Sequence, residues 1–303
     1  MGDIQGRAFS QKLERDKTLW KSIPHPKFPT ISITGSECEL NCDHCGGHYL
    51  EGMISVKGPN DLQETCLELF SEGAEGVLLS GGYNSEGYVP FEPFLDAIEQ
   101  IKIETGLFIS VHSGLVPDEL SEELGSVGVD SVNFDLIADD STISSKLGLS
   151  KKVEDYGSSL RSVSRDIPNI SPHILLGLSG KNLEQEKKGI SFLEGFDMSA
   201  LVFLIIIPPS NSNYTYSILE PDRIGHFIAE ARLKFPDTPI SLGCMRPRSK
   251  ERASIEIESI KSGIDRIVLP SRKAVDFAEN KGLVVRELEA CCSVPENFIE
   301  ERI

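Results

Sequence analysis

Three cysteines stand close together near the start of the chain, as Cys38-x3-Cys42-x2-Cys45. The chain has 303 residues and seven cysteines, and the odd number makes a disulfide framework a poor interpretation. Reduced thiols that bind a metal are the better interpretation. Thiolates are soft ligands, which suit zinc or an iron–sulfur cluster.

These three thiols leave two kinds of metal site open. A structural zinc site needs four protein ligands, so His44 or His48 would have to complete it. The chain would then be a zinc-stabilised binding module. An iron–sulfur cluster held by three thiolates instead leaves one iron open to a small molecule.

The cysteine segment follows the apolar, strand-like run 30–34. This position and the spacing resemble the signature of the radical S-adenosylmethionine (SAM) enzymes. The residue before the last cysteine is usually aromatic in that family, and here it is His44, a candidate for SAM contact. The resemblance implies a [4Fe–4S] cluster on Cys38, Cys42 and Cys45. It also implies that the open iron binds SAM and that a 5′-deoxyadenosyl radical abstracts a hydrogen atom.

Downstream of this motif, apolar runs alternate with amphipathic helical patterns, which predicts strands joined by helices in an α/β fold. Strands are predicted at 30–34, 76–80, 107–111, 131–136, 173–178, 201–207, 239–242 and 265–269. This pattern predicts a (β/α)8-type TIM barrel. A partial (β/α)6 barrel with a C-terminal extension, common in the resembled family, is the alternative.

The chain divides into three predicted parts. Residues 1–28 form an N-terminal helical extension, with Phe9, Leu13 and Trp20 on one face. Residues 29–282 form the barrel domain. Residues 283–303 form a C-terminal tail that carries two of the later cysteines.

In such a barrel the functional residues follow the C-terminal ends of the strands. Gly81 and Gly82 follow the second strand and resemble the family's Gly-Gly-Glu motif, which implies backbone contact with the SAM ammonium group. Tyr83 replaces the acidic residue of that motif. Asn133 and Asp135 share one face of the fourth strand by alternation. They resemble the ribose-binding pair of biotin synthase, and a structural hydrogen-bonding pair is the alternative.

Three further strand ends carry candidates. His112 ends the third strand, where we expect contact with substrate or SAM, unless it is a structural histidine. The fifth strand, 173–178, loosely resembles the family's adenine-contacting region, which implies that Gly177 lets the backbone approach adenine; a packed strand with a capping glycine is the alternative. Pro208 and Pro209 follow the sixth strand and predict an apolar wall over the ligand.

Three cysteines outside the first motif predict a second, auxiliary cluster. Cys244 ends the seventh strand, and Cys291 and Cys292 lie near the C-terminus. Ser293, Cys66 or an outside group would supply the fourth ligand. The alternative is that these cysteines are incidental, as Cys66 on an apolar helical stripe is expected to be.

The first motif, the segment SLGCMRPR and the late cysteine pair together resemble the biotin-synthase-like, two-protein lipoyl synthases. That resemblance implies a transferase that inserts sulfur into an octanoyl chain on a carrier protein. It implies a second radical SAM protein as partner and a reductant such as ferredoxin or flavodoxin. The competing interpretation is a single-cluster radical SAM mutase, lyase or methylase that acts on a small molecule.

The net charge of the chain limits the kinds of partner that it is expected to bind. Lys and Arg total 30 against 47 for Asp and Glu, a net charge of −17. This balance disfavours nucleic acid and a polybasic membrane anchor. No signal-peptide pattern is apparent, so we expect a cytoplasmic enzyme without a membrane partner.

A local basic segment, with Arg246, Arg248, Lys250 and Arg252, stands against this acidic background. It follows the seventh strand and predicts a docking patch for an acidic carrier protein. Arg246 is alternatively a contact of the cluster or SAM. A solvated start of the next helix is the alternative for the other three.

Overall fold

The computed structural model describes residues 2–40, 42, 44–207, 216, 218–248 and 250–302. Its strands are β1 (Thr18–Ser22), β2 (Thr30–Ser32), β3 (Ile54–Ser55), β4 (Gly76–Ser80), β5 (Phe108–His112), β6 (Ser131–Asp135), β7 (Asn169–Leu176), β8 (Leu201–Ile205), β9 (Ile240–Leu242), β10 (Arg266–Val268) and β11 (Val284–Leu288). Its longer helices are α1 (Gly2–Arg15), α2 (Pro59–Ser71), α3 (Leu95–Thr105), α4 (Asp118–Ser126), α6 (Val153–Asp166), α7 (Glu184–Phe192), α8 (Pro221–Lys234), α9 (Arg252–Lys261) and α10 (Arg272–Asn280). Shorter helical segments are η1 (His48–Leu50), η2 (Glu92–Phe94), α5 (Asp140–Thr142), η3 (Ile143–Leu147) and α11 (Glu296–Glu300).

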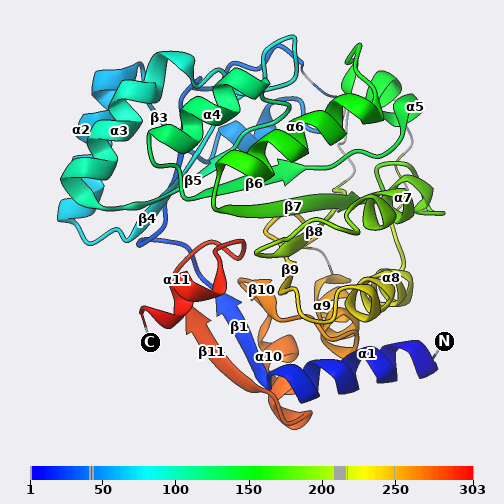
Figure 1. The fold of residues 1–303 in the computed structure, drawn as a ribbon. Helices are drawn as coiled ribbons and strands as arrows, with labels where there is room; N and C mark the ends of the chain where they lie inside the picture. The colour runs from blue at the N-terminus through cyan, green and yellow to red at the C-terminus, as the bar shows by residue number, and fades with distance from the viewer. Residues whose placement is uncertain are drawn as a thin grey trace.

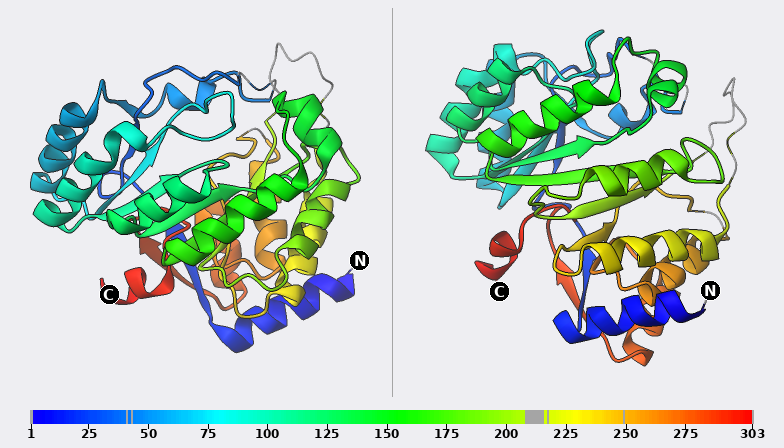
Figure 2. Two further views of the ribbon diagram at one scale, coloured as in Figure 1. Left: turned by 45° about the horizontal axis from the view of Figure 1, so that its top comes forward. Right: turned by 45° about the vertical axis from the view of Figure 1, so that its right-hand side comes forward.

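All of these strands pair in parallel in one sheet, in the order β11-β1-β10-β9-β8-β7-β6-β5-β4-β2-β3 (Figure 1). The sheet curls into a half-barrel with helices along its outer face (Figure 2). Among the described residues the edge strands β3 and β11 do not pair with each other, so the barrel is open. The expected α/β fold is therefore confirmed in its partial-barrel form.

All eight strands expected from the sequence are present, as β2 and β4 to β10, and each pairs with the next. A closed barrel of eight would need β10 to pair with β2. Instead β10 pairs with β1, and β1 pairs with β11. These two strands extend the sheet past β10.

The N-terminal segment differs from the sequence prediction. Helix α1 ends at Arg15, with Phe9 and Leu13 packed against the core. Trp20 lies on β1 and pairs with Arg266 of β10. The assignment of Trp20 to the N-terminal helix is therefore wrong, because sheet hydrogen bonds to two neighbouring strands outweigh a helical spacing of apolar residues.

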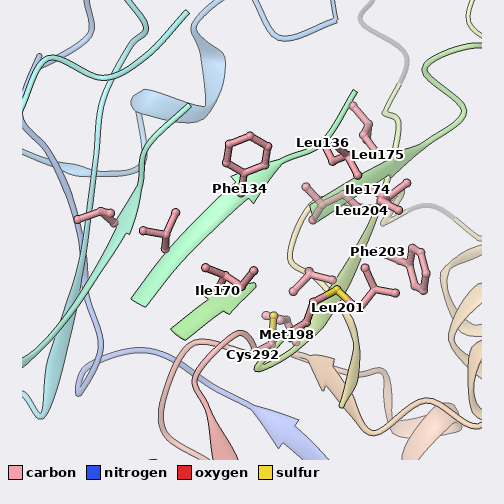
Figure 3. Packing of buried hydrophobic residues seen from close by; sticks show 14 of the residues in the cluster. Phe134, Leu136, Ile170, Ile174, Leu175, Met198, Leu201, Phe203, Leu204 and Cys292 are labelled. Atoms are coloured by element: carbon pink, nitrogen blue, oxygen red, sulfur yellow. The ribbon is translucent and has the colours of Figure 1, made fainter. Parts of the chain in front are cut away.

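The core lies on the sheet and beneath the helices that cover it. Phe134, Ile174, Leu201 and Phe203 belong to one cluster of buried apolar residues (Figure 3). Strand β8 is buried along its whole length, as expected for a parallel strand covered on both faces. The described part of the chain contains no helix long and apolar enough to cross a lipid bilayer.

Candidate functional site

The loop after β2 carries the first three cysteines. Backbone hydrogen bonds fold it tightly, since the N–H groups of Cys45 and Gly46 both donate to the carbonyl of Cys42, at 2.9 and 2.7 Å. The Cys38 thiol lies 3.9 Å from the carbonyl oxygen of Tyr83. The Cys42 thiol lies 4.0 Å from that of Leu147. All three cysteines are only partly buried.

The end of β4 holds this loop in place. The Gly82 N–H donates to the hydroxyl of Thr34 at 2.7 Å, and the Glu39 N–H donates to the Tyr83 carbonyl at 2.9 Å. A Cβ atom at Gly82 would lie 1.9 Å from the carbonyl oxygen of Glu37 and 2.6 Å from the Cβ of Cys38. Glycine is therefore required here for the cysteine loop to pack. Contact of Gly81 and Gly82 with SAM stays a prediction.

Burial and neighbouring thiols disfavour the charged form of the cysteines in this loop. Burial, followed by the charges of Cys45 and Cys38, raises the pKa of the Cys42 thiol to about 12. Burial also raises the pKa of Cys45. A bound cation offsets repulsion of this kind and draws off the thiol protons.

The donor set fits an iron–sulfur cluster better than zinc. A single zinc ion requires its ligands to converge on one point. With three thiols in the loop, zinc would need a histidine as its fourth ligand, whereas a cluster with one open iron needs only the three thiolates. Of the two histidines considered for zinc, His44 lies half-buried between the cysteines, and His48 is exposed with its Nδ1 3.2 Å from Glu51.

Asp135 lies beside this loop at the end of β6, within a polar network. Its Oδ2 is 3.0 Å from the Nε2 of His112 and accepts a hydrogen bond from the Tyr83 hydroxyl at 3.3 Å. The ring of His173 lies 5.3 Å from that of His112. Burial alone would raise the pKa of Asp135, but attraction to His112 outweighs it and holds this pKa well below its usual range. Asp135 also interacts electrostatically with Cys42 and Cys45.

The two histidines of this network differ in charge. Burial alone would lower the pKa of His112. The negative charge of Asp135 outweighs burial, so the pKa of His112 is raised. Burial and then the charge of His112 lower the pKa of His173 to about 4. The Nδ1 of His173 lies 2.9 Å from the carbonyl oxygen of Ser171, which is consistent with a neutral ring that donates from this nitrogen. His173 was not singled out from the sequence, because no motif marks it.

Asn133 and Asp135 share a strand but differ in access. The Asp135 side chain is 41% exposed, whereas Asn133 is 1% exposed. The Asn133 amide donates to the Ser110 hydroxyl at 3.1 Å, while its Oδ1 has no hydrogen-bond partner among the described residues. Asp135 is therefore the better candidate for a ligand contact, and a structural role for Asn133 gains support.

Asp135→Asn is expected to weaken SAM binding by about 1–3 kcal/mol, because the ligand loses hydrogen bonds to a charged group. The substitution keeps the side-chain size. Equilibrium binding of SAM to the reconstituted protein measures the effect, with a thermal melt to verify folding. An unchanged affinity in a folded variant would leave Asp135 a structural residue.

The late cysteine pair lies on a segment that crosses the sheet. Ser22 of β1 donates to the Ala290 carbonyl at 2.5 Å, and Ser241 of β9 donates to the Cys292 carbonyl at 2.7 Å. Ser171 of β7 donates to the Ser293 carbonyl at 2.8 Å. Buried hydroxyls from three strands thus fix residues 290–293.

Cys244, Cys291 and Cys292 come into mutual electrostatic contact. A hydrogen bond with the Cys292 thiol lowers the pKa of Cys291, and the same contact raises the pKa of Cys292. Burial, followed by the charge of Cys291, raises the pKa of Cys244, whose side chain still reaches solvent at the end of β9. The Cys291 thiol lies 3.1 Å from the Ser293 hydroxyl. Cys66 is buried on α2.

Two side chains link the cysteine groups. Burial raises the pKa of Tyr49 to about 12, and the charges of Cys45 and Cys244 add to that rise. His112, bound to Asp135, also contributes to the lowered pKa of Cys291. Tyr49 thus interacts electrostatically with one cysteine of each group, and His112 interacts with Asp135 and Cys291.

Other predicted site residues have structural contacts. The Gly177 N–H donates a hydrogen bond to the buried carboxylate of Glu186 at 3.0 Å, so this N–H already has a partner within the protein. Arg246 is fully buried and donates to Glu256 at 2.7 Å and to the Gly243 carbonyl at 2.6 Å. It is therefore no surface docking residue.

The rest of the basic segment is more open. Arg248 and Lys250 are exposed, and Lys250 lies 3.7 Å from Glu251. Arg252 donates to Glu256 at 3.1 Å. Carrier docking at Arg248 and Lys250 stays a prediction. Pro208 and Pro209, expected to form an apolar wall, lie outside the described residues.

Solved structures with other sequences share this architecture. A methylornithine synthase (PylB) matches with a TM-score of 0.64 and 14% identity, over 100% of this chain and 91% of its own. HydG from Carboxydothermus hydrogenoformans, a maturase of the FeFe-hydrogenase, matches with a TM-score of 0.69 and 15% identity, over 96% of this chain and 73% of its own. The chain has the radical SAM fold. SuiB of Streptococcus suis bound to S-adenosylmethionine shares the fold with a TM-score of 0.57 and 12% identity, over 81% of this chain and 55% of its own.

The chain also has a distant relative in sequence among curated proteins. The tRNA-2-methylthio-N(6)-dimethylallyladenosine synthase of Clostridium botulinum is 22% identical over 201 residues. The match covers 62% of this chain and 45% of the relative, so this chain spans less than half of the relative's length. No family profile matches the chain.

Proposed function

We propose that this chain is a radical SAM enzyme that inserts sulfur into a protein-bound octanoyl chain, as one component of a two-protein lipoyl synthase. The observation that carries this proposal is the presence of two separate groups of three cysteines, one after β2 and one formed by the end of β9 and the segment after β11. The first group is Cys38, Cys42 and Cys45, and the second is Cys244, Cys291 and Cys292. A single-cluster enzyme has no use for the second group.

The chain's residues divide the work. Cys38, Cys42 and Cys45 hold a [4Fe–4S] cluster, which when bound supplies the electron that cleaves SAM. Asp135, held by Tyr83 and His112, orients SAM through its ribose. The protein's own contribution is to position the substrate and to exclude water and oxygen.

The second group is the proposed source of sulfur. Cys244, Cys291 and Cys292 hold an auxiliary cluster, with Ser293 the nearest further ligand because its hydroxyl already lies 3.1 Å from the Cys291 thiol. Cys66 is too deep in the core on α2 to take this role. An auxiliary cluster bound by these residues would supply the sulfur for the octanoyl chain.

The curated relative supports sulfur chemistry but not its substrate. Its name describes the synthesis of a 2-methylthio-adenosine in tRNA, a product with an added sulfur. This chain carries a net charge of −17, which disfavours an RNA substrate. A carrier protein fits better, docked at Arg248 and Lys250, with a second radical SAM protein and ferredoxin or flavodoxin as further partners in the cytoplasm.

The alternative function is a single-cluster mutase, lyase or methylase. Its support is the fold likeness to methylornithine synthase, which matches along the whole of this chain. In that case the late cysteines have no part in the reaction.

Iron content and product analysis test the proposed function. Anaerobically reconstituted protein is expected to hold about eight irons per chain, against about four for one cluster. The variant Cys244→Ala/Cys291→Ala/Cys292→Ala is expected to keep SAM cleavage and to lose sulfur insertion into an octanoyl-lysine peptide, measured by mass spectrometry. Cys66→Ala removes a thiol outside both groups and serves as the matched control. Four irons in the wild type would favour the alternative function.

A further inference from the structure

One apolar residue at the end of β10 has a backbone conformation that its type rarely adopts. Leu269 has φ +48°, in the left-handed region that favours glycine. Among the described non-glycine residues, only Leu183 shares a positive φ, of 56°. Conformations of this kind persist only where surrounding contacts impose them, and they are concentrated at functional sites.

Contacts of the main chain impose the conformation of Leu269. Its N–H donates to the Ser22 carbonyl at 2.9 Å, and its carbonyl accepts hydrogen bonds from Arg246 and Arg252. The side chain is nevertheless 39% exposed. Leu183 is 3% exposed, so burial in the core offsets its strain. The side chain of Leu269 gains much less within this chain.

Leu269 follows the strand next to the one that Cys244 follows. Arg246 donates both to the Gly243 carbonyl at 2.6 Å and to the Val268 carbonyl at 2.5 Å, which joins the end of β9 to the end of β10. Cys244 and Leu269 each come directly after one of these bonded residues. Both therefore lie at the C-terminal edge of the half-barrel, on neighbouring strands.

Two other exposed apolar residues flank Cys244. Ile207 is 38% exposed and follows β8, and the Ile205 N–H donates to the Met245 carbonyl at 2.9 Å beside it. Tyr49 is 36% exposed and interacts electrostatically with both Cys45 and Cys244. Tyr49, Ile207 and Leu269 together are named the apolar rim.

We propose that Leu269 is a specificity-determining residue and that the apolar rim receives the saturated acyl chain of the substrate. This inference rests on the proposed function and deepens it. The side chains of Ile207 and Leu269 have no polar group, so these two offer an ionic small molecule no partner. An extended aliphatic chain instead removes the exposed surface of Leu269 from water, which is the burial that the strained residue lacks in the free protein.

The test uses Leu269→Asn and Leu183→Asn in the reconstituted holoprotein with SAM. Asparagine tolerates the left-handed region, so only the apolar side chain is lost. Binding of fluorescent lysine peptides bearing butanoyl, hexanoyl or octanoyl groups is measured by anisotropy. Wild type is expected to bind more tightly as the chain lengthens. Leu269→Asn is expected to lose about tenfold in octanoyl affinity and to bind the butanoyl peptide as wild type does.

Thermal melts separate a structural role from a binding role. Leu183→Asn is expected to lower Tm strongly, because it places an amide in the core, whereas Leu269→Asn is expected to leave Tm unchanged or raised. A Tm loss in Leu269→Asn as large as in Leu183→Asn would overturn the inference. So would wild-type preference for the octanoyl peptide in that variant. If wild type binds no acyl peptide of any length, the proposed function itself fails, and this inference fails with it.

Discussion

Replacing Cys38, Cys42 and Cys45 together with alanine is expected to abolish reductive cleavage of SAM. The variant should also hold about four irons fewer per chain than the wild type after reconstitution. The reason is chemical, since these three thiols lie in one tightly folded loop after β2 and are the proposed ligands of the cluster that cleaves SAM. Formation of 5′-deoxyadenosine under anaerobic, reducing conditions measures the loss.

The late-cysteine variant is the matched control for this experiment. It removes the same number of thiols from the same protein, yet it should retain SAM cleavage because its cysteines follow β9 and β11 rather than β2. Far-UV circular dichroism of both variants verifies the fold. Retention of SAM cleavage by the first variant would contradict the assignment of the cluster, and equal losses in the two variants would contradict the division into two groups.

The strands were predictable because parallel strands covered on both faces appear as short apolar runs. Strand β8 is the clearest case, with Leu201–Ile205 buried throughout. Strand β1 was missed because Thr18–Ser22 is short and directly follows a helix, and its pairing partners β10 and β11 lie more than 240 residues later. A sequence pattern does not contain that distant partnership.

The sequence predicts at which strand ends the candidate residues lie, but not how deeply each side chain is buried. Alternation correctly placed Asn133 and Asp135 on one strand face, yet the packing of neighbouring strands buries the first and leaves the second open. Arg246 was assigned to a basic surface from its neighbours in sequence, whereas Glu256 on α9 neutralises it inside the protein. The contact between Cys244 and the late cysteine pair also depends on tertiary structure, because Ser241 and Ser171 hold the segment across the sheet.

One buried carboxylate, that of Asp265, interacts with several cationic side chains where α1 contacts the half-barrel. Asp265 is 2% exposed, and its oxygens contact Lys12 at 2.8 Å, Arg15 at 2.6 Å and also Arg232. Asp265 also accepts a hydrogen bond from the Ile240 N–H at 2.7 Å. One carboxylate thus joins α1, α8 and the starts of β9 and β10.

Asp265→Asn is expected to lower the free energy of unfolding by about 3–5 kcal/mol, since it leaves buried cations without a counter-charge. Urea denaturation of the protein measures the change. The matched control is Asp276→Asn, which removes an exposed carboxylate 2.7 Å from Arg272 on α10 and is expected to cost less than about 1 kcal/mol. Equal losses of unfolding free energy in the two variants would show that the buried ion pairs of Asp265 stabilise the fold no more than an exposed ion pair does.

The pH dependence of stability gives the same network a second test. Burial alone would raise the pKa of Asp265, but Arg232, Lys12 and Arg15 outweigh it and hold this pKa well below its usual range. A lowered folded-state pKa means that the unfolded chain binds the proton more readily, so the stabilisation is complete above the unfolded-state pKa of about 3.9. It is lost progressively as the pH falls below that value. Asp265→Asn should therefore show a shallower loss of stability in acid than wild type, and parallel curves would assign the acid sensitivity to other carboxylates.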